Sequence, residues 1–178
     1  MSSDLSQRVR SVIRNVPDFP KPGILFRDIT TLLLRPDLMQ ESLEEMWRPF
    51  DGQVDIIAGI ESRGFLLGAA LSVTKGLPFV PLRKPGKLPA ETIRESYTLE
   101  YGTDALEMHR DAVSAGSRVL IVDDLLATGG TAAAAARLVE HVGGRVVGLS
   151  FLIELVGLGG RDRLGDASVH VLLAYDEA

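Results

Sequence analysis

The sequence predicts an α/β fold in which a mainly parallel central sheet is flanked by helices. Short, continuously apolar stretches such as 118–122 and 145–153 alternate with stretches in which apolar residues recur at helical spacing. Strands without a polar side are typical of a parallel sheet that helices cover on both faces. The chain has 178 residues, 46% of them hydrophobic and 24% charged. This composition suits one globular domain over residues 1–178 and excludes a disordered chain.

The first third of the chain is expected to place two helices around an extended segment. Apolar residues at helical spacing predict an amphipathic helix over 5–16. The connector 17–23 contains three prolines and a glycine, which end that helix. We expect residues 24–29 to be extended and a second helix to start at Pro36, because proline suits the first helical position.

Strands and helices then alternate. The polar stretch 83–96 contains Pro85, Gly86 and Pro89, so we expect it to be a mobile loop within a mobile region spanning 83–103. The other expected elements are strands over 54–58, 78–82, 118–122, 145–153 and 169–174, helices over 65–74 and 131–142, a turn over 59–64 and an extended segment over 97–101.

Charge and composition exclude several classes of protein. The formal net charge is −5, which argues against a nucleic-acid binder held by phosphate contacts. There is no cysteine, so disulfides, thiolate metal sites and cysteine nucleophiles are absent. The first residues have no apolar signal core, and no uncharged stretch approaches the roughly 20 residues of a membrane helix. We expect a cytoplasmic protein with no membrane or nucleic-acid partner.

The run VLIVDDLLATGGT, residues 119–131, carries the clearest chemical signal. A buried strand leads into two acids, and a turn of small residues then opens a helix. Ligands of parallel sheets bind beyond the carboxyl ends of the strands, and free N–H groups at a helix start bind anions. The turn is therefore expected to hold a phosphate, and the neighbouring carboxylates to hold sugar hydroxyls or a hydrated magnesium ion. The residues concerned are Asp123, Asp124, Ala127, Thr128, Gly129, Gly130 and Thr131.

Gly129 is expected to allow close approach of the backbone to the phosphate, so that a side chain there would obstruct substrate and leave the fold intact. Other phosphate signatures fail. No Gly-x-Gly-x-x-Gly follows a strand, and the 59–64 segment has Walker spacing but Phe65 in place of the required lysine. The alternative for the run itself is a helix cap followed by an ordinary glycine turn.

The run resembles the phosphoribosyl pyrophosphate motif of the type I phosphoribosyltransferases. Five further segments are similar to the adenine-specific members of that family and follow in the family's order: 20–28 (PKPGILFRD), 61–65 (ESRGF), 83–89 (RKPGKLP), 96–102 (SYTLEYG) and 153–155 (IEL). The resemblance covers about residues 9–164. It implies a type I phosphoribosyltransferase fold with a mobile active-site loop, and transfer of the phosphoribosyl group from phosphoribosyl pyrophosphate to adenine, giving AMP and pyrophosphate.

The resemblance also implies which residues hold the pyrophosphate. These are Glu61, Ser62 and Arg63, with a non-proline cis peptide between the first two, together with Arg83, Lys84, Lys87 and His109. The loop lysines and Arg83 are implied to reach the neighbouring site across a homodimer interface. Taken alone, Arg63 could form a surface ion pair, the charges of the loop could be solvated, and His109 could be exposed.

For the base and the reaction, the resemblance implies Glu100 as the acid/base residue at the purine, with Arg63 and Tyr101 also catalytic. It places residues 1–30 in a helix and a base-binding segment, with Leu25, Phe26, Arg27 and Leu155 around adenine. Glu100 could otherwise face solvent, and Tyr101 or Phe26 could simply pack. Magnesium is expected to be coordinated mainly by the substrate's oxygens, with little direct ligation by the protein and no protein metal site. Alternatives are an enzyme for another purine, or a sensor of phosphoribosyl pyrophosphate that regulates genes.

Overall fold

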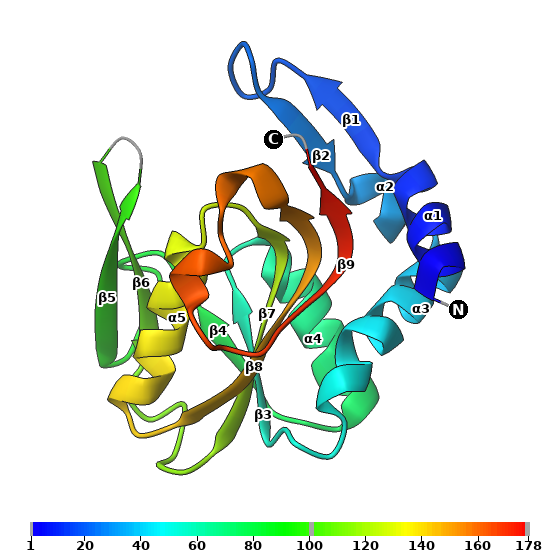
Figure 1. Cartoon of the computed structure of the whole chain (residues 1–178). Helices are drawn as coiled ribbons and strands as arrows, with labels where there is room; N and C mark the ends of the chain where they lie inside the picture. The colour runs from blue at the N-terminus through cyan, green and yellow to red at the C-terminus, as the bar shows by residue number, and fades with distance from the viewer. Residues whose placement is uncertain (1, 100–101, 177–178) are drawn as a thin grey trace.

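The computed structural model, which describes residues 2–99 and 102–176, confirms the α/β class (Figure 1). Its central sheet has five strands in the order β4-β3-β7-β8-β9, and every neighbouring pair is parallel. The strands are β3 (Ile56–Ile60), β4 (Phe79–Leu82), β7 (Arg118–Leu126), β8 (Arg145–Leu155) and β9 (Val169–Tyr175). The continuously apolar strands of the sequence thus form the buried centre of the domain.

Helices cover both faces of the sheet and enclose two apolar cores (Figure 1). On one face lie α1 (Ser2–Val12), α3 (Pro36–Trp47) and α4 (Arg63–Lys75), whose buried residues pack with Ile57, Leu120 and Leu152. On the other face lies α5 (Gly130–His141), which packs with Val119 and Ile121. Among the described residues, no helix is both long and apolar enough to cross a bilayer.

Two antiparallel hairpins stand outside the central sheet (Figure 1). The first pairs β1 (Arg14–Pro17) with β2 (Leu25–Asp28), and the short helix α2 (Thr30–Leu33) follows it. The expected helix over 5–16 is therefore too long, because α1 ends at Val12 and Val16 pairs with Phe26 in this hairpin. Proline disfavours the helical conformation of the residue before it, which explains why the segment before Pro17 is extended.

The second hairpin corrects the expected mobile loop over 83–96. β5 (Thr92–Leu99) pairs with β6 (Gly102–His109) and packs on α5, so the loop proper is shorter than predicted. Strand β3 is likewise shifted from the expected 54–58, because residues 59 and 60 pair with β4 and are not part of a turn.

Strand β4 is one edge of the sheet and contains Pro81. Immediately after it, Arg83 forms an antiparallel bridge with Glu107 of β6, with N–O distances of 2.9 and 2.7 Å in the two directions. This bridge attaches the β5–β6 hairpin to the end of β4 and so fixes where the cationic segment 83–87 begins.

Candidate active site

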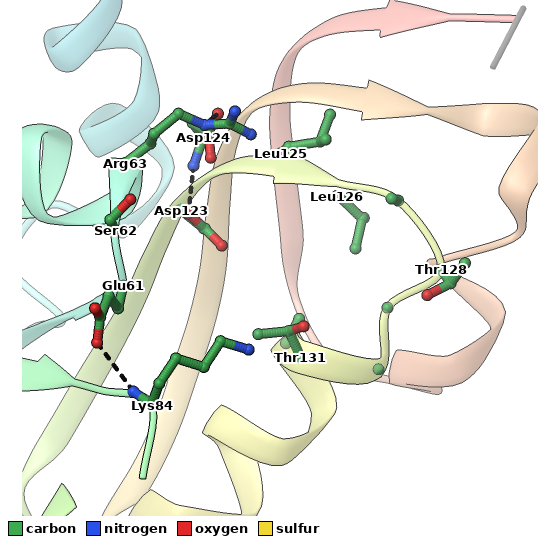
Figure 2. A pocket seen from close by; sticks show the side chains of 14 residues that line it. Glu61, Ser62, Arg63, Lys84, Asp123, Asp124, Leu125, Leu126, Thr128 and Thr131 are labelled. Carbon is green, nitrogen blue, oxygen red and sulfur yellow. Dashed lines mark hydrogen bonds and ion pairs between the residues drawn. The ribbon is translucent and has the colours of Figure 1, made fainter. Parts of the chain in front are cut away.

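Four neighbouring strands, β4, β3, β7 and β8, end at the same edge of the sheet. Predicted site residues lie in the segments that follow β4, β3 and β7, and Leu155 is the last residue of β8. Between them is a cleft of about 360 Å³ (Figure 2). Its lining residues are Glu61, Ser62, Arg63, Lys84 and the continuous run 123–132. The structure therefore brings together the predicted phosphoribosyl-binding residues and part of the predicted pyrophosphate-binding set.

The phosphate loop, which we define as residues 127–129, connects β7 directly to α5. Gly129 has a φ of +77° and precedes the first residue of the helix. A Cβ placed on Gly129 would overlap the carbonyl oxygen of Gly160 and lie 3.2 Å from the Cβ of Arg163. The expectation that a side chain here would leave the fold intact is therefore wrong, because the glycine is also required for packing against the 156–164 segment.

Asp123 and Asp124 lie within β7, which continues for two further residues, to Leu126. Asp124 is only 4% exposed, and its carboxylate pairs with Arg63, with Nε and Oδ2 2.6 Å apart. Asp123 accepts a hydrogen bond from the backbone N–H of Asp124 at 2.8 Å (Figure 2). Burial, and then the charge of Asp124, raise the pKa of Asp123 well above its ordinary value, while Arg63 opposes this shift.

Glu61 gathers three donors from the segment that follows β4. It accepts hydrogen bonds from Arg83 Nε at 3.2 Å, from the Lys84 backbone N–H at 3.0 Å and from Lys87 Nζ at 2.5 Å. The predicted cis peptide between Glu61 and Ser62 is present. Burial alone would raise the pKa of Glu61, but the hydrogen bonds from Lys87, Lys84 and Arg83 outweigh it and lower the pKa to about 2.

Lys84 is the cation of this segment that enters the cleft, where its side chain points toward Thr131 at the start of α5 (Figure 2). Its amino group donates to the hydroxyl of Tyr97 at 2.6 Å and forms an ion pair with Asp104, both on the β5–β6 hairpin. Burial would lower the pKa of Lys84, but these two partners raise it, so the side chain stays charged at neutral pH.

The depressed pKa of Glu61 predicts how its ion pairs depend on pH. A carboxylate with a folded-state pKa near 2 and an unfolded-state value of 4.5 stabilises the fold fully above pH 4.5, and this contribution disappears as pH falls toward 2. We expect the wild type to melt above Glu61→Gln at pH 6 to 7, and the difference in melting temperature to shrink below pH 4.5. Thermal unfolding of both proteins across this range tests it. A difference that is equal at pH 6 and pH 2.5 would contradict the assignment.

The predicted base-binding residues adjoin the cleft through Phe26, because the guanidinium of Arg63 lies 5.0 Å from the centre of its ring. Arg27 donates to Asn15 Oδ1 at 2.6 Å and stacks on Tyr175, with its guanidinium carbon 4.2 Å from the ring centre. Tyr175 is in turn the register partner of Leu155 at the end of β8. The Nε atom of Arg27 is buried and has no hydrogen-bond partner among the described residues.

Several predicted residues lie apart from the cleft lining. Arg83 and Lys87 are not among the lining residues, but both form ion pairs with Glu61, which is. His109, at the far end of β6, accepts a hydrogen bond from the Ala90 N–H at 3.4 Å. Glu100 and Tyr101 lie outside the described residues. Conversely, the cleft is also lined by Leu125, Leu126 and Ala132, to which the sequence assigned no role. The sequence could have indicated their role, because Leu125 and Leu126 lie inside the 119–131 run and Ala132 directly follows it.

The fold and the cleft together define a phosphoribosyltransferase, and the Phosphoribosyl transferase domain family matches residues 35–166. The adenine phosphoribosyltransferase of Solibacter usitatus is 59% identical over 172 residues, which are 95% of this chain and 98% of that protein. The crystal structure of adenine phosphoribosyltransferase from Rhodothermus marinus has a TM-score of 0.93 at 52% identity and covers 97% of this chain and 99% of its own. The Saccharomyces cerevisiae adenine phosphoribosyltransferase, complexed with an imino-altritol bisphosphate and adenine, has a TM-score of 0.90 at 41% identity, with coverage of 96% and 99%. The chain belongs to the adenine phosphoribosyltransferase family.

Proposed function

We propose that this chain transfers the phosphoribosyl group of phosphoribosyl pyrophosphate to adenine, forming AMP and pyrophosphate in purine salvage. The observation that carries the proposal is the cleft itself, in which the phosphate loop, two carboxylates and Arg63 lie together with the ring of Phe26 beside Arg63. We also propose a cytoplasmic location, since both substrates are metabolites of the cell interior.

The phosphate loop and the start of α5 would hold the 5′-phosphate of the substrate. Residues 127–131 offer backbone N–H groups at the positive end of the helix and the hydroxyls of Thr128 and Thr131. Asp123 and Asp124 precede the loop and would accept hydrogen bonds from the ribose hydroxyls. Phosphate and sugar diol are thus recognised by consecutive residues of one strand, loop and helix.

Transfer requires N9 of adenine to bond to C1′ while the bond from C1′ to the pyrophosphate oxygen breaks, with inversion at that carbon. Negative charge grows on the leaving pyrophosphate, so cations beside it lower the barrier. Arg63 and Lys84 line the cleft and would supply this charge, with Glu61 and Ser62 shaping the same wall. Once the 83–87 segment is released from Glu61, Arg83 and Lys87 would reach the pyrophosphate in the partner subunit's site, and His109 would assist there.

Magnesium fits this site as a substrate-borne ion. In residues 2–99 and 102–176 no group of three or more histidine, aspartate or glutamate side chains is placed to hold a metal. The carboxylates Asp123 and Asp124 offer oxygens, the donors that Mg²⁺ prefers, and would contact its water shell. When bound to pyrophosphate, the ion would add positive charge to the leaving group.

At the base, Phe26 and Leu155 would form the two apolar walls, and Arg27 would line its edge. Glu100 would interact with N7 as the acid/base residue while N9 attacks and adenine loses its proton. Tyr101 would lie beside the reacting sugar. We propose a further role at the base for the Leu25 backbone, whose register partner in β1 is Pro17, a residue with no N–H to donate to the Leu25 carbonyl.

The Leu25 backbone predicts the choice of base. Its carbonyl would accept from the 6-amino group of adenine and its N–H would donate to N1, whereas hypoxanthine and guanine reverse both features. We expect kcat/KM for adenine to exceed that for hypoxanthine by roughly 10⁴, because mismatched polar groups are left unpaired in the site. The measurement is nucleotide formation from each purine base with magnesium and phosphoribosyl pyrophosphate.

Leu25→Val is the matched variant for this prediction. Since the backbone does the recognition, the substitution should leave the preference for adenine nearly unchanged. Comparable use of hypoxanthine by the wild type would overturn the adenine assignment. Loss of discrimination in Leu25→Val alone would show that the side chain selects the base.

We further propose that the enzyme is a homodimer in which Lys87 serves the partner subunit's site. On α4, the apolar side chains of Leu66 and Val73 are 48% and 82% exposed and lie two helical turns apart on one side of the helix. Such a stripe suits contact with a second copy. Lys87 is half-exposed, and in its own chain it pairs with Glu61 without lining the cleft.

Mixing of two inactive variants tests this arrangement. If Lys87 acts across the interface, dimers that combine one Lys87→Ala chain with one Asp124→Ala chain contain one intact site. After full exchange of equal amounts, about a quarter of the wild-type activity should return. Subunit exchange is verified with tagged chains. No recovery after verified exchange would show that the segment serves its own subunit.

A further inference from the structure

The segment 156–164 packs directly against the phosphate loop, although none of its residues has been assigned a role above. It follows β8 as two short 3₁₀ turns, Val156–Leu158 and Asp162–Leu164, on either side of Gly159 and Gly160. Most of the segment is exposed, but Gly160 is buried. A buried glycine in an exposed connection indicates that another part of the backbone lies against it.

Gly160 and the phosphate loop lie so close that neither glycine at the contact, Gly129 or Gly160, has room for a Cβ atom. A Cβ on Gly129 would overlap the Gly160 carbonyl oxygen, as described above. A Cβ on Gly160 would in turn overlap the carbonyl oxygen of Ala127 and come within 3.0 Å of the Leu126 side chain. The two backbones therefore touch at both positions, and neither has room for a side chain.

This contact accounts for the orientation of the loop. A phosphate loop has to present N–H groups to its anion and turn its carbonyl oxygens away, because a carbonyl dipole facing a phosphate repels it. The Ala127 carbonyl lies against Gly160, so it is turned toward the 156–164 segment. Any movement of Gly160 toward the phosphate loop would therefore first displace the peptide group that contains the Ala127 carbonyl.

Arg161 anchors the segment to the end of the sheet. Its Nε lies 2.8 and 2.9 Å from the two carboxylate oxygens of Glu154, and its Nη1 donates to the Val169 carbonyl at 3.2 Å. Glu154 is 5% exposed and is the register partner of Leu126 in β7, the last residue before the phosphate loop. Glu154, which holds Arg161, is thus paired across the sheet with the residue that precedes the phosphate loop.

We propose that Gly160 and Arg161 are positioning residues for the phosphate loop, and that the 156–164 segment is a brace which keeps the Ala127 peptide in its anion-binding orientation. The inference rests on the proposed function, since it concerns affinity for the 5′-phosphate of phosphoribosyl pyrophosphate. It assigns neither residue a direct contact with substrate.

The test compares Gly160→Ala with Gly159→Asn. The added methyl group in Gly160→Ala pushes on the Ala127 carbonyl, and we expect Kd and KM for phosphoribosyl pyrophosphate to rise about tenfold or more while KM for adenine stays unchanged. Gly159 has a φ of +63°, which asparagine tolerates, and a Cβ there meets only Asp162 Oδ2, at 3.4 Å. Gly159→Asn should therefore bind phosphoribosyl pyrophosphate as the wild type does.

A second variant covers the case in which Gly160→Ala does not fold. Arg161→Met combined with Glu154→Gln removes the anchor without leaving a buried charge unpaired, and it should raise KM for phosphoribosyl pyrophosphate selectively. Unchanged binding in the folded variants, or equal losses for both substrates and in Gly159→Asn, would overturn the brace. Failure of the wild type to bind phosphoribosyl pyrophosphate in calorimetry would instead refute the proposed function.

Discussion

Gly129→Val is expected to abolish binding of phosphoribosyl pyrophosphate and to lower the melting temperature at the same time. A β-branched residue is strained at a φ of +77°, and its Cβ would overlap the Gly160 carbonyl. The loop can relieve this overlap only by moving, which turns its N–H groups away from the phosphate. We expect an affinity loss of roughly 100-fold or more, measured by calorimetry with phosphoribosyl pyrophosphate.

Thr128→Val is the control for this prediction. It removes one hydroxyl donor from the same loop without adding a side chain to a glycine, so it should weaken binding by about tenfold at most and leave the melting temperature nearly unchanged. If Gly129→Val bound phosphoribosyl pyrophosphate normally, residues 127–129 would not be the phosphate site.

Arg63→Met is expected to lower both the stability and the activity of the protein, and the two effects can be separated. Arg63 is the ion-pair partner of the buried Asp124, so its removal leaves a buried carboxylate beside Asp123 without a counter-charge. We expect a stability loss of about 2 kcal/mol, less than for a fully buried pair, because one third of the Arg63 side chain is exposed. Activity should fall by roughly 10³, because the leaving pyrophosphate loses a cation.

The double variant Arg63→Met with Asp124→Asn separates these effects. With both charges removed, thermal unfolding should return toward the wild-type value, while kcat stays well below that of Asp124→Asn alone. A double variant as active as Asp124→Asn alone would show that Arg63 only neutralises Asp124. Arg63→Lys keeps the charge but not the geometry of the guanidinium, and should retain most of the stability and part of the activity.

Much of the site could be predicted because its signal is local in the sequence. A buried parallel strand that runs through acids into small residues and a helix occupies one continuous run, and its residues 123–132 all line the cleft. The interactions of Glu61 could not be predicted in this way. Its partners Arg83, Lys84 and Lys87 lie more than 20 residues away and meet it only because β3 and β4 are adjacent.

The errors have physical causes of the same kind. Pro85, Gly86 and Pro89 mark a turn, but the expected loop also included the start of the strand Thr92–Leu99. In that strand Ile93 and Tyr97 are buried, but the polar Glu95 lies between them on the same face, so the sequence shows no clear alternation of apolar and polar residues. Gly160 gives no local signal at all. Its importance depends on the backbone of a loop some 30 residues earlier, which only the folded sheet brings beside it.

The β4 edge also bears on how the protein behaves at high concentration. An exposed edge strand offers unpaired N–H and carbonyl groups to other chains, and so invites intermolecular strand addition. Here Pro81 removes one N–H from the edge, and the next free backbone groups, those of Arg83, are already bonded to Glu107. The bridge that positions the cationic segment beside the cleft therefore also occupies backbone groups that another chain could pair with at the end of this edge. A substitution that detached the β5–β6 hairpin would cost solubility as well as catalysis.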